Sequence, residues 1–323
     1  SSFSWSRTAW HEFAHTITLG QSRGQVPRWL TEGLSVYEEK MRRSVWGREM
    51  HKELYDRLRN DRLLRMDKIN RAFRGPDIMF AYYQGGLIAE HLTESRGFEV
   101  IPRMLVAFGK DRTTAEVFKE VLGLELADYD RQFRAFVEKQ VGDYRMVPLW
   151  DQKSLEAFEA KVEAKPDDAL AWTRLGWAHL QRNRGIDAGD KLNRALKLDP
   201  ALPEAILLEG RIAELNGRPD LAMGHYARYL ETGEDDFMAR IFLAGQASQA
   251  GKGGEAIEHL EQAKRCFPAM VGPQSPHLLL AKLYTGSGRV ADAVRELEAY
   301  ASVAGEDYGV RKKLLDHFAG RDD

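Results

Sequence analysis

Cysteine, long apolar runs and net charge are all scarce in this sequence. Of its 323 residues only one is cysteine, Cys266, which excludes an intrachain disulfide and a zinc site built from several thiolates. No apolar run reaches the roughly 18 residues of a membrane-spanning helix. A formal net charge of −2 gives the chain no overall attraction to nucleic acid or to an anionic membrane. The remaining composition, 43% hydrophobic and 30% charged residues, is typical of soluble globular proteins and suits two domains.

The first feature with chemical content is a His-Glu-x-x-His motif at residues 11–15. Residues four apart lie one above the other on a helix, so His11 and His15 are expected to aim their rings at one point. A catalytic zinc ion takes three protein ligands and keeps a fourth position for water. Glu12 lies about 100° further round the helix than His11. That position suits a general base acting on zinc-bound water better than a ligand.

The third ligand must come from another segment, and Glu32 is the best candidate. Ser6 or Thr8 is expected to cap the first helix, which Gly20 ends. A second helix is predicted over residues 27–43, because Pro27 suits a first helical turn. Gly33 on its apolar stripe is expected to let the two helices approach closely. The run at residues 38–40 is expected to be exposed to solvent.

The motif order resembles that of the gluzincin branch of the zincin metallopeptidases, in which His-Glu-x-x-His precedes a Glu on the next helix. The sequence PRWLTEGLSVYEE is similar to the second motif of compact bacterial members of that group. The resemblance implies that His11, His15 and Glu32 bind one Zn²⁺ and that Glu12 is the base. The gap of sixteen residues between His15 and Glu32 is slightly shorter than in the best-known gluzincins. The alternative is that the histidines are hydrogen-bonded core residues.

A further helix is predicted around Gly85 and Gly86, within residues 81–92. Compact gluzincin-like peptidases carry a similar Tyr-x-Gln-small helix, so the resemblance implies that Tyr82 stabilises an oxyanion, with Tyr83 as the second choice. The alternative is that both tyrosines only pack, and His91 is expected to be structural or exposed. Helices are also predicted over residues 98–108, 113–121 and 125–140. The charged stretch at residues 48–74 is expected to form a solvated helix face, because it lacks aromatic residues that would stack on bases.

The extent of the first domain also follows from the resemblance. Zincin folds place a β-sheet upstream of the metal-binding helix, and this sequence begins ten residues before His11. The resemblance therefore implies a gluzincin-like domain at residues 1–147 that is incomplete at its N-terminus, with the upstream sheet absent. It also suggests a bacterial extracytoplasmic location. The run Gly142-Asp143-Tyr144-Arg145-Met146-Val147-Pro148 breaks the helical pattern and sets the domain boundary.

The second domain, residues 148–323, shows an internal repeat of 34 residues. Its small and large residues fall at the positions of tetratricopeptide (TPR) repeats. Four repeats are predicted at residues 169–202, 203–236, 237–270 and 274–307, with Glu209 replacing the usual Leu in the second. Residues 154–164 are expected to form an adapting helix and residues 307–319 a polar capping helix. The predicted fold class is therefore mainly α, with a zincin-like helical core followed by an α-solenoid.

Three functions fit this organisation. The first is a zinc metallopeptidase whose repeats recruit a protein substrate or a partner on their concave face, and the presence of Glu12 favours it. The second is a catalytically silent, peptidase-like scaffold whose repeats bind a protein partner. The third is hydrolysis of some other amide, because a zinc-hydroxide site does not by itself choose between amides. Neither nucleic acid nor a membrane span is expected.

Overall fold

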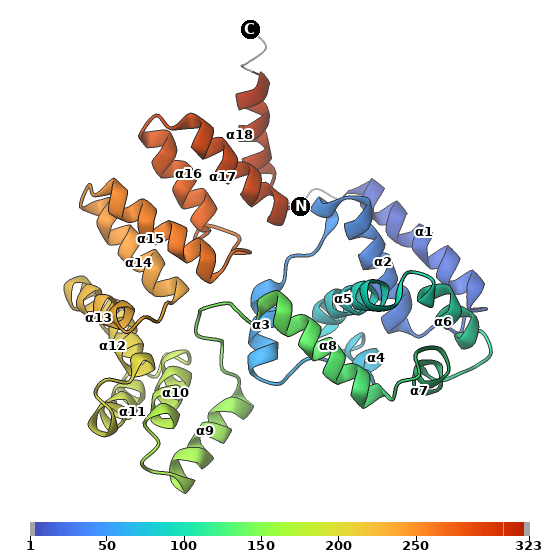
Figure 1. Ribbon diagram of the computed structural model, residues 1–323, viewed down its shortest axis with the longest axis horizontal. Coiled ribbons are helices and arrows are strands. Elements are labelled where there is room, and N and C mark those ends of the chain that lie inside the picture. The colour runs from blue at the N-terminus through green and yellow to red at the C-terminus, as the bar shows by residue number, and fades with distance from the viewer. Residues whose placement is uncertain (1–3, 306, 320–323) are drawn as a thin grey trace. The chain divides into compact units, whose positions relative to one another are not determined.

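The computed structural model describes residues 4–305 and 307–319. Within these ranges the chain is helical and contains no strand, which confirms the prediction of a mainly α protein. The chain divides into two compact units, residues 1–142 with 301–323, and residues 143–300. Figure 1 shows the helices of both units along the chain. The domain limits of 1–147 and 148–323 stay a prediction, and they include residues 1–3, 306 and 320–323, which lie outside the described residues.

The first unit contains eight α-helices before residue 142, together with α18, among the residues that the structure describes. They are α1 (Trp5–Gln21), α2 (Arg28–Arg42), α3 (His51–Arg59), α4 (Ile69–Ala72), α5 (Ile78–Arg96), α6 (Val100–Phe108), α7 (Thr114–Val117), α8 (Leu126–Val141) and α18 (Tyr308–Ala319). A 3-10 turn at Ser44–Trp46 and a π-helical turn at Phe118–Leu122 complete the unit.

The ends of α1 differ from those that the sequence predicted. Ser4, rather than Ser6 or Thr8, is the N-cap, and its hydroxyl accepts a hydrogen bond from the Arg7 N–H at 3.4 Å. The helix also continues past Gly20 to Gln21, because a glycine lowers helix stability without obliging the helix to end. The chain turns only at Arg23 and Gly24, where φ is 52° and 77°.

The segments between α2 and α8 are less regular than their sequence pattern suggests. The charged stretch at residues 48–74 forms two short helices, α3 and α4, with a non-helical turn between them. The helix predicted over residues 113–121 begins with a capping box between Thr113 and Glu116. After four residues it widens into the π-helical turn, which ends at Gly123 with φ of 69°.

Helices α2 and α5 cross each other closely at their glycines. A methyl group on Gly33 would lie 2.5 Å from the carbonyl oxygen of Gly85, and one on Gly86 would lie 2.8 Å from Val36 Cγ1. The prediction that Gly33 allows a close approach of α1 and α2 was therefore wrong about the partner helix. The glycines of residues 81–92 do lie on the packed side of their helix, as expected. This crossing fixes the face of α2 that carries Glu32.

The second unit is a series of paired helices whose buried apolar side chains form several core clusters. Its helices are α9 (Gln152–Ala164), α10 (Ala169–Leu180), α11 (Gly185–Leu198), α12 (Pro203–Leu215), α13 (Pro219–Glu231), α14 (Phe237–Gln249), α15 (Gly253–Cys266), α16 (Pro276–Gly286) and α17 (Val290–Val303). The pairs follow the predicted repeats along the chain. Gly210 shows why the repeat needs a small residue: a methyl group there would lie 2.5 Å from the ring of Tyr226. In the described residues, no helix is long and apolar enough to span a membrane.

Candidate metal centre

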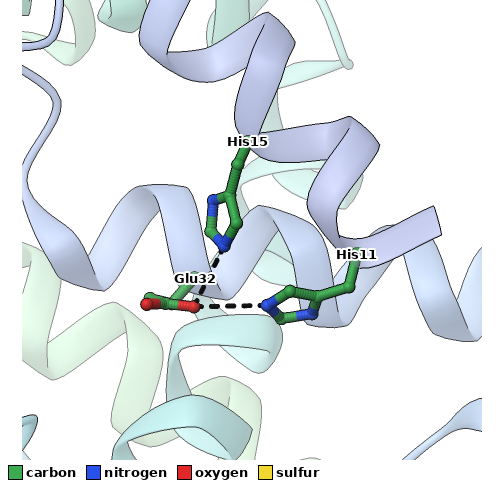
Figure 2. Close-up of side chains that lie close together, drawn as sticks. All are labelled: His11, His15 and Glu32. Atoms are coloured by element: carbon green, nitrogen blue, oxygen red, sulfur yellow. Dashed lines mark hydrogen bonds and ion pairs between the residues drawn. The ribbon is translucent and has the colours of Figure 1, made fainter. Parts of the chain in front are cut away.

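The structure brings His11, His15 and Glu32 together. His11 and His15 lie one turn apart on α1, and their ring centroids are 4.9 Å apart. Glu32 lies on α2, and its Oε2 atom is 3.3 Å from Nε2 of His11 and 3.3 Å from Nε2 of His15. Figure 2 shows both rings pointing at this carboxylate oxygen. One possible ligand atom from each of the three side chains lies within 4.8 Å of the other two.

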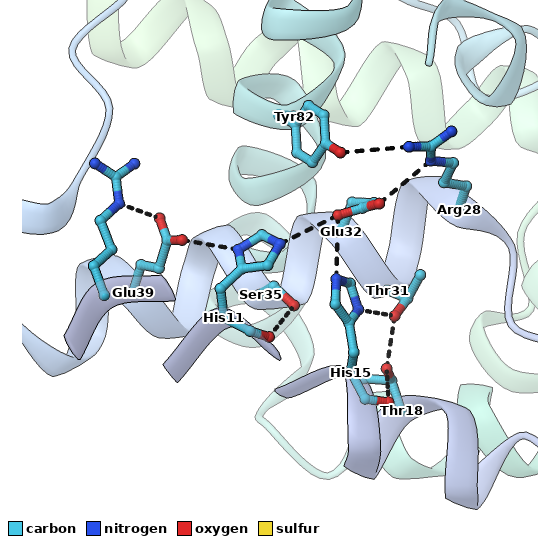
Figure 3. A network of polar contacts seen from close by, with 10 residues as sticks. His11, His15, Thr18, Arg28, Thr31, Glu32, Ser35, Glu39 and Tyr82 are labelled. Atoms are coloured by element: carbon cyan, nitrogen blue, oxygen red, sulfur yellow. Dashed lines mark hydrogen bonds and ion pairs between the residues drawn. The ribbon is translucent and has the colours of Figure 1, made fainter. Parts of the chain in front are cut away.

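The Nδ1 atom of each imidazole ring also makes a hydrogen bond. His11 Nδ1 donates to Glu39 Oε1 at 2.8 Å, and Arg7 Nε donates to the other oxygen of Glu39 at 3.0 Å. His15 Nδ1 lies 2.7 Å from Thr31 Oγ1, which in turn lies 2.7 Å from Thr18 Oγ1 (Figure 3). These contacts leave the Nε2 atom of each ring directed at Glu32.

Burial and charge act against each other in this cluster. Burial lowers the pKa of His11, but hydrogen bonds to Glu32 and Glu39 outweigh it and raise the pKa to about 9. Burial raises the pKa of Glu32, and the hydrogen bonds from His11 and His15 reverse this effect and leave the pKa well below its usual range. Arg28 Nε donates to Glu32 Oε1 at 3.3 Å and adds a second positive neighbour. The carboxylate of Glu32 is therefore held in its ionised form, which a metal ligand requires.

The donor set and its spacing fit a zinc ion. Imidazole nitrogen and carboxylate oxygen are both usual zinc ligands. Two ligands that each lie about 2.0–2.1 Å from a tetrahedral ion are about 3.3 Å apart. The observed distances between Glu32 Oε2 and the two imidazoles are also 3.3 Å. Metal-binding imidazoles usually donate their other N–H to a carboxylate or another oxygen, which is the role of Glu39 and Thr31 here.

The remaining predicted residues lie around this cluster. Glu12 is exposed on α1, next to His11. Tyr82 on α5 has its ring 6.5 Å from that of His11, and its hydroxyl oxygen accepts from Arg28 Nη2 at 3.5 Å. Tyr83 is buried beside Phe80 and packs, with ring centroids 6.1 Å apart. His91 is a structural residue, as expected: it is buried, and its Nδ1 lies 3.2 Å from the Tyr129 hydroxyl.

Sequence reasoning missed Glu39 and Thr31. Glu39 was expected to be exposed with its neighbours, but only 3% of its side chain is accessible. The spacing in the sequence could have revealed Glu39, because it follows Glu32 by seven residues and therefore lies on the same face of α2. Thr31 is adjacent to Glu32, and its own contact to His15 could not be read from spacing alone.

Comparison with known proteins finds a family match within the second unit. Residues 152–203 match the tetratricopeptide repeat family. A stretch of 53 residues is 38% identical to the peroxisomal targeting signal receptor of Candida albicans, covering 16% of this chain and 9% of that receptor. The chain thus spans less than a tenth of the length of that relative. The prediction of TPR repeats is confirmed, and such repeats bind protein or peptide partners.

Several solved structures are also similar to the chain. MamA is 18% identical, with a TM-score of 0.37, over 49% of this chain and 90% of that one. YrrB, described as a TPR protein with an unusual peptide-binding site, is 15% identical, with a TM-score of 0.42, over 52% and 85%. PilW, described as a type IV pilus biogenesis factor, is 20% identical, with a TM-score of 0.39, over 77% and 96%. TM-scores this low support no further conclusion about the chain.

The comparisons contradict the prediction that the chain is a zinc metallopeptidase. The family that matches, over residues 152–203, is an interaction repeat and not a peptidase. The roles predicted for Glu12 as a general base and for Tyr82 as an oxyanion donor belonged to that prediction, and they are withdrawn with it. What the family match supports is a repeat of the kind that binds proteins or peptides, at residues 152–203.

Proposed function

We propose that this chain is an interaction scaffold. Its repeats bind a peptide segment of a protein partner, and its first unit holds one Zn²⁺ ion at His11, His15 and Glu32. The match of residues 152–203 to the tetratricopeptide repeat family carries the first part. The convergence of both Nε2 atoms on Glu32 Oε2 supports the second.

The proposed zinc ion joins α1 to α2 in the manner of a zincin-like helix pair. Two of its ligands come from α1 and one from α2, so the ion adds a link between two helices that already contact each other through Glu39 and Thr31. Three protein ligands leave one coordination position for a water molecule. Since the folded arrangement assembles the three ligands, zinc binding stabilises the folded first unit.

The metal is tested by isothermal titration calorimetry of the full chain with zinc chloride. The parent is expected to bind one ion per chain, and His15→Ala is expected to lose that binding. His51→Ala is the matched control, because His51 lies in the same unit and contacts Glu49 rather than the cluster. Loss of one imidazole ligand with no change in affinity would contradict the proposed site.

The scaffold role is tested by selecting peptides from a display library on the immobilised full chain. A selected peptide that carries a photoreactive group is expected to cross-link to residues 152–303. His15→Ala is expected to retain the peptide, because the zinc ligands lie in the other unit. Cross-links confined to residues 4–142 would contradict the assignment of binding to the repeats.

A further inference from the structure

The segment between α8 and α9, residues 143–150, lies against the repeats of its own unit. We call it the connecting segment. It has no helix or strand. Tyr144, Met146, Pro148 and Trp150 are buried or half-buried, and Val147 is half-buried as well, whereas the other three side chains, Asp143, Arg145 and Leu149, are exposed. A residue before proline favours extended backbone, so Pro148 favours this form at Val147. Apart from Val147, the pattern is that of an extended peptide with alternate side chains directed at a surface.

The third repeat holds the main chain at the start of this segment. The Arg145 N–H donates to the Cys266 carbonyl at 3.0 Å, and the Phe237 N–H donates to the Arg145 carbonyl at 2.8 Å. The Val147 N–H donates to the buried carboxylate of Asp236. The side chain of Arg145 takes no part in these main-chain bonds, so they do not depend on its identity.

The first repeat holds the main chain at the end of the segment. Gln181, directly after α10, donates from Nε2 to the Pro148 carbonyl at 2.8 Å. Its Oε1 accepts from the Trp150 N–H at 2.9 Å. One side-chain amide therefore pairs with both an acceptor and a donor of the segment. Figure 1 shows the chain passing α14 and α10 before it enters α9.

Apolar side chains fill the space between these two anchors. Tyr144 and Met146 pack against the cluster that contains Phe237 and Phe267, and the ring centroids of Tyr144 and Phe267 are 4.8 Å apart. Val147 and Trp150 pack against the core of the first two repeats. The indole N–H of Trp150 is buried and has no hydrogen-bond partner among the described residues. A buried donor without a partner weakens binding, so the segment fits its site imperfectly.

We propose that this face of the repeats is a peptide-binding site that residues 143–150 occupy in cis. Main-chain hydrogen bonds with pockets for alternate side chains are a general mode of binding extended peptides. The partner is an extended peptide with large apolar side chains at alternate positions, and it displaces the connecting segment. Because the segment is tethered, it competes at an effective concentration of roughly millimolar order. The inference rests on the proposed function and names the site and the chemistry of its ligand.

The test uses the full chain with an opened site. The opened variant carries Tyr144→Ser, Met146→Ser and Trp150→Ser. The probe is a fluorescein-labelled peptide with blocked ends and the sequence of residues 143–150, and fluorescence anisotropy measures its binding. The opened variant is expected to bind the probe at least tenfold more tightly than the parent. A probe of scrambled sequence is expected not to bind. Adding Gln181→Met, which keeps the size of the side chain but removes its amide, is expected to weaken binding about tenfold.

Two results would overturn the inference. One is a folded opened variant, verified by circular dichroism, that binds the probe no better than the parent does. The other is unchanged binding after Gln181→Met. If the opened variant does not fold, hydrogen exchange on the parent provides the test. Excess unlabelled probe must then accelerate exchange of the chain's own Arg145 and Trp150 amides, and unchanged exchange refutes displacement. If a library peptide still cross-links to the repeats when the probe fails, the proposed function stands and only this inference is lost.

Discussion

The orientation of each imidazole in the metal centre depends on a side chain that is not itself a proposed ligand. His11 is oriented by Glu39 and His15 by Thr31, through contacts of 2.8 and 2.7 Å to their Nδ1 atoms. Such contacts fix the ring and its tautomer, and they reduce the ordering that metal binding must still impose. Their loss should therefore weaken zinc binding without removing a ligand.

Thr31→Val tests this contribution. Valine has nearly the shape of threonine but no hydroxyl, so the variant loses the contact to His15 and keeps its packing. Zinc affinity, measured by competition with a chelating dye, is expected to fall about tenfold to a hundredfold. Thr16→Val is the control, because Thr16 is exposed on α1 and its hydroxyl donates to the Phe13 carbonyl. Equal affinity of Thr31→Val and the parent would show that Thr31 does not position His15.

Asp236 gives the second unit a pH dependence. Burial raises the pKa of this carboxyl to about 6, although backbone N–H groups of Ala239 and Met238 act in the opposite direction. Between about pH 4 and pH 6 the folded state therefore keeps a proton on Asp236, whereas the unfolded chain, with a pKa near 3.8, has released it. This group favours folding most below about pH 4, and its contribution decreases as the pH rises towards 6.

Asp236→Asn should remove that dependence, because asparagine caps α14 equally well and carries no charge. The unfolding free energy of the variant minus that of the parent is expected to be about 2–3 kcal/mol larger at pH 7 than at pH 4. Urea unfolding at the two pH values measures this change. Asp190→Asn, at an exposed position in the same unit, is the control. If the unfolding free energies of variant and parent differ by the same amount at pH 4 and pH 7, Asp236 is not the source of the pH dependence.

The sequence predicted which side chains lie together in the candidate metal centre where helix geometry determines the contact, and metal binding itself stays a prediction. Two histidines four residues apart share a helix face whatever surrounds them, and Glu32 followed from the start of the next helix. Glu39 was missed because its charged neighbours suggested solvent, whereas its actual environment depends on how α1 covers α2. The enzyme prediction failed for another reason: a set of ligands defines a metal site, and the activity of the whole chain does not follow from it.

At the scale of the elements, α2 is the helix on which the first unit depends. It contacts α1 through the cluster and α5 through its glycines, and ten of its residues are buried. Helical periodicity in the sequence predicted where α2 lies along the chain. It could not predict that Gly33 meets Gly85, because contacts between segments far apart in sequence leave no periodic pattern. The π-helical turn after α7 was missed for a similar reason, since it has no sequence pattern of its own.

Gly33→Ala tests the crossing of α2 and α5. The added methyl group would lie 2.5 Å from the Gly85 carbonyl oxygen, so the helices must move apart. The first unit is expected to lose about 1–3 kcal/mol, as overpacked cores do. The control is Gly20→Ala on α1, where a methyl group meets nothing within 4 Å. That control is expected to be neutral or stabilising by about 0.5–1 kcal/mol. Equal stabilities of the two variants in urea unfolding would contradict the crossing.

At the scale of the whole molecule, each of the two units has its own core, so each is expected to unfold in its own transition. Differential scanning calorimetry of the full chain should show that zinc at about 100 times its Kd stabilises one transition by about 2.7 kcal/mol. For a unit of this size the shift in Tm is roughly 5–10 °C. The other transition should not move, and His15→Ala should abolish the shift. A zinc shift that survives His15→Ala would contradict the site.

The central claim is that the chain acts through its repeats as a binding protein, and hydrogen exchange with a library-selected peptide tests it most directly. Peptide added to the full chain at saturating concentration is expected to slow amide exchange in the repeat unit, at α10, α12 and α14. The exchange of α1 and α2 is expected to stay unchanged. Protection confined to residues 4–142, with none in the repeats, would contradict the account.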